Sequence, residues 1–282
     1  MENGISTAAL QASNAPKAGL MRYLSLYGAL ARNSVVREMQ FKVSFLLWIL
    51  VELMWFALQL TFMSVLYTKT ASIAGWSKWE VIMLAAFSNL LQELFTAIFL
   101  TNLTELSELI RSGKLDFMLL MPVNPRFLVS FRKVDLGAFV NAGCAIAVMV
   151  YAGKNLHLDP SVSRLAGFAG LGMAALLVHY SLAFMLGSIA FWTIRAQGVI
   201  WGYYNLFNIA RLPAEAFKGA FKAVFTFGLP MLLVSNVPVK VLVSKLASPA
   251  SVFELCGMSA LVFLLSEWVW RTALKQYTSA SA

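Results

Sequence analysis

The sequence predicts an all-α integral membrane protein with six transmembrane helices. This prediction rests on its composition, its apolar runs and its distribution of charge. Of the 282 residues, 60% are hydrophobic and only 12% are charged, and the mean hydropathy is +0.74. A soluble domain has roughly a quarter of its residues charged, so half that share cannot cover a surface that faces water. The charges that exist are concentrated in short stretches between long apolar ones.

Six apolar runs are long enough to span a bilayer, which takes about 20 residues in a helix. The predicted spans are about 43–67, 81–101, 134–153, 165–192, 219–238 and 251–270. Together they predict a single transmembrane domain over residues 21–282. Residues 1–20 are small and polar and lack the basic start and continuous apolar run of a signal peptide. They are predicted to form a disordered cytoplasmic tail.

The distribution of Lys and Arg predicts which side of the membrane holds the termini. Six spans place both termini on one side, and basic residues concentrate in cytoplasmic loops. With these spans, sixteen basic residues fall on the side of the termini and six on the other side. The sequence therefore predicts an inner-membrane protein with both termini in the cytoplasm. It also attributes the net charge of +9 to loops rather than to a nucleic-acid surface, which needs a clustered basic patch.

Residues 21–42 carry the pattern of an amphipathic helix ahead of the first span. Apolar side chains recur at helical spacing, with three arginines among them: Leu24, Tyr27, Leu30, Ala31 and Val35 against Arg22, Arg32 and Arg37. Such a helix lies in the membrane interface, with its basic residues near anionic headgroups. The alternative is a straight cytoplasmic extension of the first span.

Catalytic and metal-binding signatures are missing from the sequence. It has no phosphate-binding loop of the type G-x-x-x-x-G-K-[ST], no H-E-x-x-H and no G-x-S-x-G. Its two histidines, His157 and His179, are too far apart for a convincing zinc site. Cys144 and Cys256 lie inside apolar runs and are interpreted as packing residues. The sequence thus predicts a non-catalytic chain that binds no metal or cofactor.

Three polar residues inside the spans are candidate functional groups: Glu52, Glu93 and His179. A charge in lipid is costly, so such groups face the bundle interior or water. They could form a proton or cation site, or they could make contacts that orient the helices. Two isolated acids with no evident basic partner favour the structural role. Glu267, near the end of the last span, is expected to meet Arg271 four residues later.

The loop between the second and third predicted spans resembles a docking element. Asn102 followed by Glu105 is typical of a helix start, and Gly113 is typical of a helix end. Apolar residues share one face of this helix and charged residues lie away from it: Leu103, Leu106, Leu109 and Ile110 against Glu105, Glu108 and Arg111. The helix could dock on a soluble partner or simply lie on the surface, and the pattern alone does not separate the two.

Three motifs in this order resemble the permease subunits of type-2 ATP-binding-cassette (ABC) transporters. They are residues 110–117 with 119–124, the segment 210–213 leading to 217–219, and the tail 268–271 with 275–280. The resemblance implies six spans, an interfacial helix and a cytoplasmic coupling helix. It implies ATPase subunits that hold ATP and Mg²⁺, and a second permease subunit, the same or a different chain. It also implies that the ATPase contact involves Glu105, Glu108, Ile110, Arg111, Lys114 and Asp116.

Two other classes of protein remain as alternatives. An ion-gradient-driven secondary transporter would use Glu52 and Glu93, but such carriers often contain internal repeats and none is evident. A membrane-embedded enzyme would need clustered polar residues at one membrane depth, and the sequence shows no such cluster. The substrate and the direction of transport are not encoded in any motif, although export is expected from the resemblance.

Overall fold

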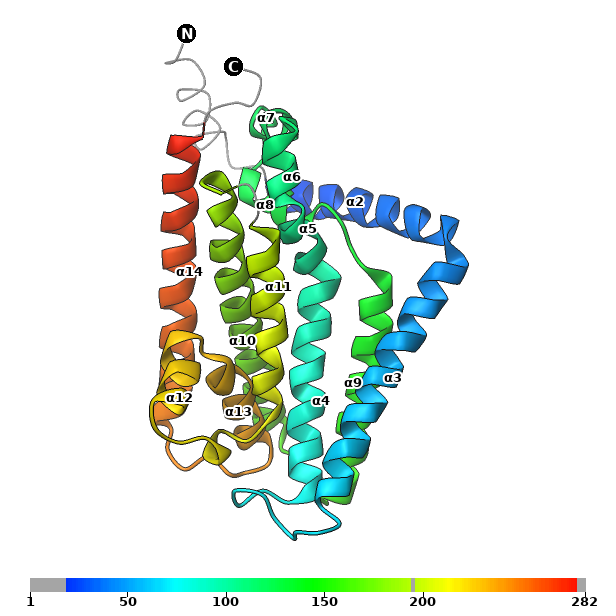
Figure 1. Ribbon diagram of the computed structural model, residues 1–282, viewed down its shortest axis with the longest axis vertical. Helices are drawn as coiled ribbons and strands as arrows, with labels where there is room; N and C mark the ends of the chain where they lie inside the picture. Colours follow the sequence, from blue (N-terminus) through cyan, green and yellow to red (C-terminus); the bar gives the residue numbers. More distant parts are fainter. Residues whose placement is uncertain (1–18, 194–195, 278–282) are drawn as a thin grey trace.

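The computed structural model describes residues 19–193 and 196–277 and shows an elongated bundle of helices (Figure 1). The predicted tail, residues 1–20, falls almost wholly outside the described residues. In chain order the elements are α2 (Leu20–Gln40), α3 (Lys42–Leu66), α4 (Lys78–Phe95), η1 (Thr96–Leu100), α5 (Thr101–Thr104), α6 (Leu106–Arg111), α7 (Lys114–Leu119), α8 (Pro125–Phe131), α9 (Leu136–Asn155), α10 (Val162–Ser188), η2 (Ile189–Phe191), α11 (Gln197–Leu206), η3 (Phe207–Arg211), η4 (Ala214–Ala216), α12 (Gly219–Ala223), η5 (Val224–Gly228), α13 (Met231–Leu242) and α14 (Ala250–Gln276).

The two ends of the bundle are distinct. One end carries α2, α6, α7 and α8, and the opposite end carries α12, α13 and the loop between α3 and α4 (Figure 1). We call them the α7 end and the α13 end. Five helices of the described chain are long and apolar enough to cross a membrane, which confirms the predicted class of all-α integral membrane protein.

Helix α2 is a separate helix, as the amphipathic pattern predicts. The helical geometry breaks at Phe41, and α2 projects sideways from the bundle before the chain turns into α3 (Figure 1). A straight extension of the first span is therefore wrong. Helix α3 is also unusual, because only 6% of its most apolar stretch is buried in the protein, against 78% for the corresponding stretch of the second span. The first span thus lies at the edge of the bundle and presents Trp48, Trp55 and other large apolar side chains outward.

The second span is longer than predicted and ends differently. A continuous helical rod of 34 residues runs from Lys78 to Arg111, about 51 Å at 1.5 Å per residue, and contains a π-helical turn at Thr96–Leu100. The predicted helix start at Asn102 is wrong, because Asn102 lies inside this rod with its side chain fully buried. The predicted end is confirmed: Gly113 follows the rod with a φ of 68°.

The fifth predicted span, residues 219–238, is not one helix. It is split at Leu229–Pro230, and the pair formed by 219–228 and α13 is bent by 82°. Both ends of this pair lie at the α13 end of the bundle. Before it, Glu215 accepts a hydrogen bond from Trp76 Nε1 at 3.0 Å; after it, Lys245 contacts Glu80 at 2.6 Å. The segment therefore enters and returns, which corrects the prediction.

The fifth passage through the bundle is made instead by α11 and η3, which the sequence analysis placed in a loop. Ile200 lies beside Gly187 at the α7 end, and Gly187 also approaches Leu103. Ser88 donates to the carbonyl of Ala210 at 2.9 Å. Residues 103 and 88 of the rod are about 22 Å apart along its axis, so residues 200–210 descend through most of the bundle. With the five long apolar helices, this shorter segment gives six passages, although the predicted fifth span is not one of them.

Candidate functional site

The tip at the α7 end is built from α6, a glycine turn and α7. Arg111 contacts Glu108 at 2.8 Å on the outer surface of α6, and both side chains are more than half exposed. The apolar face of α6 points the other way, since Leu106 and Leu109 are buried against the protein's own core. The apolar face is therefore used within the bundle, and the charged face is the one available to another protein.

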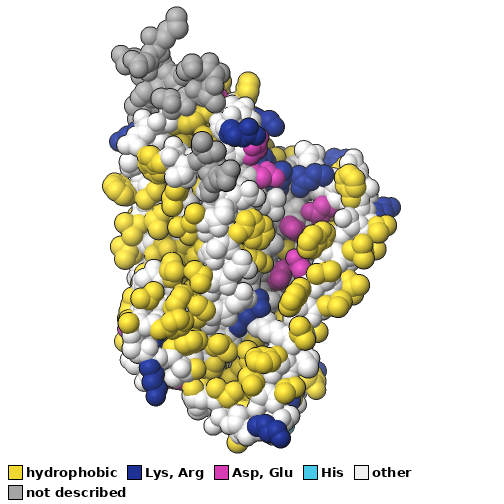
Figure 2. Space-filling view, in the orientation of Figure 1, with side chains coloured by type: hydrophobic (Ala, Val, Ile, Leu, Met, Phe, Trp, Pro, Cys, Tyr) yellow, Lys and Arg dark blue, Asp and Glu magenta, His cyan; other side chains and the backbone are white. Residues whose placement is uncertain are grey.

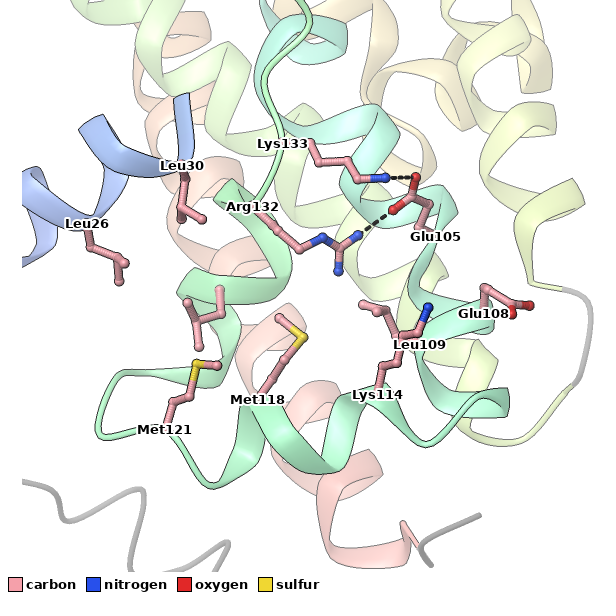
Figure 3. Close-up of a pocket in the computed structure, with 11 residues that line it drawn as sticks. Leu26, Leu30, Glu105, Glu108, Leu109, Lys114, Met118, Met121, Arg132 and Lys133 are labelled. Atoms are coloured by element: carbon pink, nitrogen blue, oxygen red, sulfur yellow. Dashed lines mark hydrogen bonds and ion pairs between the residues drawn. The ribbon is translucent and has the colours of Figure 1, made fainter. Parts of the chain in front are cut away.

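Glu105 and Asn102 close the base of this tip. Glu105 binds Arg132 at 2.5 Å and also binds Lys133 (Figure 3). The Asn102 amide donates to the carbonyls of Ser130 and Lys133 at 3.1 and 2.7 Å. Both residues thus hold the start of the loop against its end. Glu105, predicted at the partner contact, is placed where it ties the loop together.

Arg126 anchors the tip to the rest of the bundle, a role that the sequence analysis missed. The side chain is 9% exposed and contacts Glu267 at 2.6 Å. It also donates to the Ser266 hydroxyl at 2.8 Å and to the Tyr180 hydroxyl at 3.0 Å. Glu267 meets Arg271 at 2.7 Å as predicted, so that pair extends into a network that joins α8 to α10 and α14.

The outermost surface of the tip is apolar as well as charged. Phe117 is 70% exposed and Leu120 is 72% exposed, beside the exposed Lys114 and the Glu108–Arg111 pair. Ile110 and Asp116 are half-buried; burial and then the nearby Asp116 raise the pKa of Tyr277 at the end of α14. Large apolar groups exposed at a polar end commonly mark a protein contact. Phe117 and Leu120 lie beside the predicted contact residues, and their exposure could not be predicted from the sequence.

A cavity of about 670 Å³ separates the tip from α2 (Figure 3). Leu26 and Leu30 of α2 face Leu109, Met118 and Met121 across it, and the Glu105 ion pairs lie along one side. A largely apolar gap therefore lies between the tip and α2, and α2 contacts the chain beyond α7 through Tyr23, whose ring packs against Phe127.

A second polar region lies within the bundle and corrects the expectation of isolated acids. Glu52 of α3 and Glu93 of α4 line one cavity of about 770 Å³, together with Arg211 of η3. The Asn141 amide of α9 donates to Glu52. Arg211 donates to Gln92 at 2.6 Å, to Asn89 at 3.3 Å and to Gln59. Carboxylates, carboxamides and a guanidinium are thus clustered at similar depth.

His179 lies outside this cavity. It is fully buried between α10 and α11, where Nδ1 is 2.6 Å from the Tyr203 hydroxyl and the rings of Phe95 and Phe207 lie against it. Its Nε2 is buried with no hydrogen-bond partner among the described residues, so only one of the two ring nitrogens is bonded. The three intramembrane candidates therefore separate into a pair of acids in a cavity and a histidine in the core.

The long apolar helices, the lateral helix α2 and the exposed tip define an all-α integral membrane protein. Residues 53–281 match the sequence model of a family described as ABC-2 family transporter protein, and since the match covers most of the chain, the chain belongs to that family. No protein among curated sequences matches it. The chain is therefore a permease of the ABC transporter class, a class of generally non-catalytic membrane subunits.

Proposed function

We propose that this chain exports a substrate across the bacterial inner membrane, driven by ATP that a separate ATPase subunit hydrolyses. The α7 end faces the cytoplasm, and the ATPase contacts the tip through Glu108, Arg111, Lys114, Phe117 and Leu120. A second permease subunit, the same or a different chain, completes the pathway. ATP and Mg²⁺ are held by the ATPase, and this chain contributes no catalytic group.

One observation carries this proposal: the rod Lys78–Arg111 has the exposed tip at one end and cavity-lining residues along its length. Gln92 and Glu93 lie on the same helical rod as Glu108 and Arg111, with the π-helical turn and the turn at Glu105 between them. A partner that moves the tip therefore moves one wall of the cavity. Coupling of this kind requires that ATP binding favour one of two arrangements of the bundle.

The exposed edge of the bundle supports a second permease subunit. Helix α3 presents large apolar side chains along most of its length, including Trp48, Trp55 and Phe62. Lipid can cover such a helix, but the cavity holding Glu52 and Glu93 opens beside it. A second permease subunit against α3 would complete the wall of that cavity and shield its polar groups.

The first test is a mild-detergent pull-down of the tagged chain with mass spectrometry and an ATPase assay. We expect an ATP-hydrolysing partner in stoichiometric amount. Absence of both the partner and ATP turnover would contradict the proposal. It would favour the ion-gradient-driven carrier, in which Glu52 and Glu93 would be the residues to test.

A charge-swap series separates a partner contact from local helix stability. Glu108→Arg alone and Arg111→Glu alone break the surface pair, and the double variant restores it with reversed polarity. If the ATPase recognises these charges, all three variants lose substrate-stimulated ATP turnover by about tenfold or more. Rescue by the double variant would instead assign the pair to helix stability. Lys69→Glu at the α13 end is the matched control and leaves turnover unchanged.

A further inference from the structure

We propose that the groove between α3 and the α4–α9 pair binds an organic cation, an amine or quaternary ammonium with an apolar body, and that this is the substrate class. The inference rests on the proposed transport function and deepens it. It is carried by two adjoining cavities, the carboxylates in them and the aromatic side chains around them.

The two cavities adjoin at Glu52, and we treat them as one path. The first, about 410 Å³, lies where α2 meets α3 and is lined by Glu38, Asp135 and Glu52. The second is the 770 Å³ cavity deeper in the bundle, lined by Glu52 and Glu93. Glu52 borders both. Figure 2 shows acidic side chains gathered along the hollow between the α3 arm and the rest of the bundle. The path therefore leads from the interfacial helix to the middle of the bundle.

Three of the four carboxylates of this path accept hydrogen bonds from neutral groups. Glu38 accepts from the Leu136 amide at 3.1 Å, Asp135 accepts from the Ala138 amide at 3.1 Å, and Glu52 accepts from Asn141. Glu93 is 7% exposed, and its Oε2 has no hydrogen-bond partner among the described residues. None of the salt bridges in the described chain involves these four acids. Arg37 and Arg211 interact electrostatically with Glu38 and Glu93 respectively, without forming a salt bridge.

These two basic groups that line the path compensate the acids only in part. Arg211 binds the three neutral side-chain oxygens of Gln59, Asn89 and Gln92. Arg37 lies at the mouth of the first cavity and its side chain is exposed. Four carboxyl groups against two guanidinium groups leave the path with more acidic than basic side chains, and like charges at partly buried positions repel each other. A bound cation relieves that repulsion, and a bound anion increases it.

Aromatic rings supply the second half of the recognition. Phe41, Phe45 and Trp48 line the first cavity, and Trp55, Phe56 and Phe62 line the second. Aromatic faces attract cations, Trp most strongly, and they also pack against an apolar body. Cavities of these volumes are in the range of small-molecule sites. Acids deep in the groove with aromatic groups along it favour a cation that carries apolar substituents.

Two probes of matched shape and opposite charge test the inference: tetraphenylphosphonium and tetraphenylborate. Binding of each is measured by equilibrium titration to the purified full chain, with its ATPase partner where one is found, in lipid nanodiscs. Binding of each probe is corrected for its partition into protein-free nanodiscs. We expect tetraphenylphosphonium to bind, and tetraphenylborate to bind at least about tenfold more weakly. The double variant Glu52→Gln, Glu93→Gln should lose about tenfold in affinity for the cation. Glu254→Gln, an exposed acid of α14, is the control and keeps the wild-type affinity.

The double variant Glu52→Asp, Glu93→Asp keeps both carboxylates and controls for misfolding caused by substitution at these positions. It should retain most of the cation affinity. Equal binding of the two probes, or unchanged cation affinity in the glutamine variant, would overturn the inference. This assay needs no ATP hydrolysis. If the cation does not bind but the ATPase partner is found, only the proposed substrate class is wrong. If the cation binds but no ATPase partner is found, only the ATP-driven mechanism is wrong.

Discussion

Asn102 illustrates how one buried amide can hold two distant segments together. Its Oδ1 accepts from the Lys133 amide at 2.9 Å, and its Nδ2 reaches carbonyls of Ile98, Ser130 and Lys133. We expect Asn102→Ala to cost about 2–4 kcal/mol, because several buried backbone groups lose their partner at once. Thermal unfolding in detergent measures this. The matched control is Asn155→Ala, whose exposed amide binds only the Tyr151 carbonyl. An effect of Asn102→Ala no larger than the control would contradict this role.

At the same scale, Asn102 shows why some residue roles escape sequence reasoning. An Asn followed three residues later by Glu has the spacing of a helix N-terminus, and both residues are polar enough for one. Their actual partners, Ser130, Arg132 and Lys133, lie about 30 positions further on. Glu267–Arg271, by contrast, was predictable because helix geometry fixes a contact four residues apart.

At the scale of elements, the turn between α6 and α7 sets the direction of the exposed tip. Gly113 has a φ of 68°, a conformation that a residue with a Cβ adopts only at a cost. We expect Gly113→Ala to destabilise this turn by about 1 kcal/mol and to lower ATP turnover of the assembled transporter, because Phe117 and Leu120 are reoriented. Gly143→Ala is the control, since Gly143 is helical with open space around it. Equal turnover in both variants would show that the turn geometry does not matter for coupling.

Hydropathy predicted most of the membrane-spanning helices. It failed for the fifth passage, because an apolar segment bends back there and a more polar segment crosses the bundle. Spans one, three, four and six correspond to α3, α9, α10 and α14 within a few residues. Residues 219–238 are apolar enough for a span, but Pro230 splits them. The real fifth passage contains Asn205, Asn208 and Arg211, whose polarity hides it from any apolar window. Those same residues line the deep cavity, so the feature that obscured the passage is the one that builds the site.

At the scale of the whole molecule, the polar cavity assembles from segments far apart in sequence. Glu52, Glu93, Asn141 and Arg211 come from four different passages, and no periodicity relates them. Composition therefore predicted the class of protein, and the family motifs predicted the tip, while the clustering of acids became visible only in three dimensions. The corrected fifth passage also moves Lys218 and Lys222 to the α13 end and takes Arg211 into the bundle. The basic excess at the α7 end becomes smaller without reversing.

The topology yields a prediction that distinguishes the two assignments of the fifth passage. In a variant with Cys144→Ser and Cys256→Ser, we introduce Lys222→Cys and treat intact cells with a membrane-impermeant maleimide. If α11 and η3 cross the membrane and 219–242 enter and return, Lys222→Cys reacts from outside, as does the Lys69→Cys control at the same end. Arg111→Cys, at the α7 end, reacts only after the membrane is permeabilised. All of these native side chains are exposed, so burial does not obscure the result.

Protection of Lys222→Cys in intact cells, with Lys69→Cys labelled, would place residue 222 on the cytoplasmic side. The bent pair would then be a broken span, and the path from α2 to Glu93 would have to be redrawn.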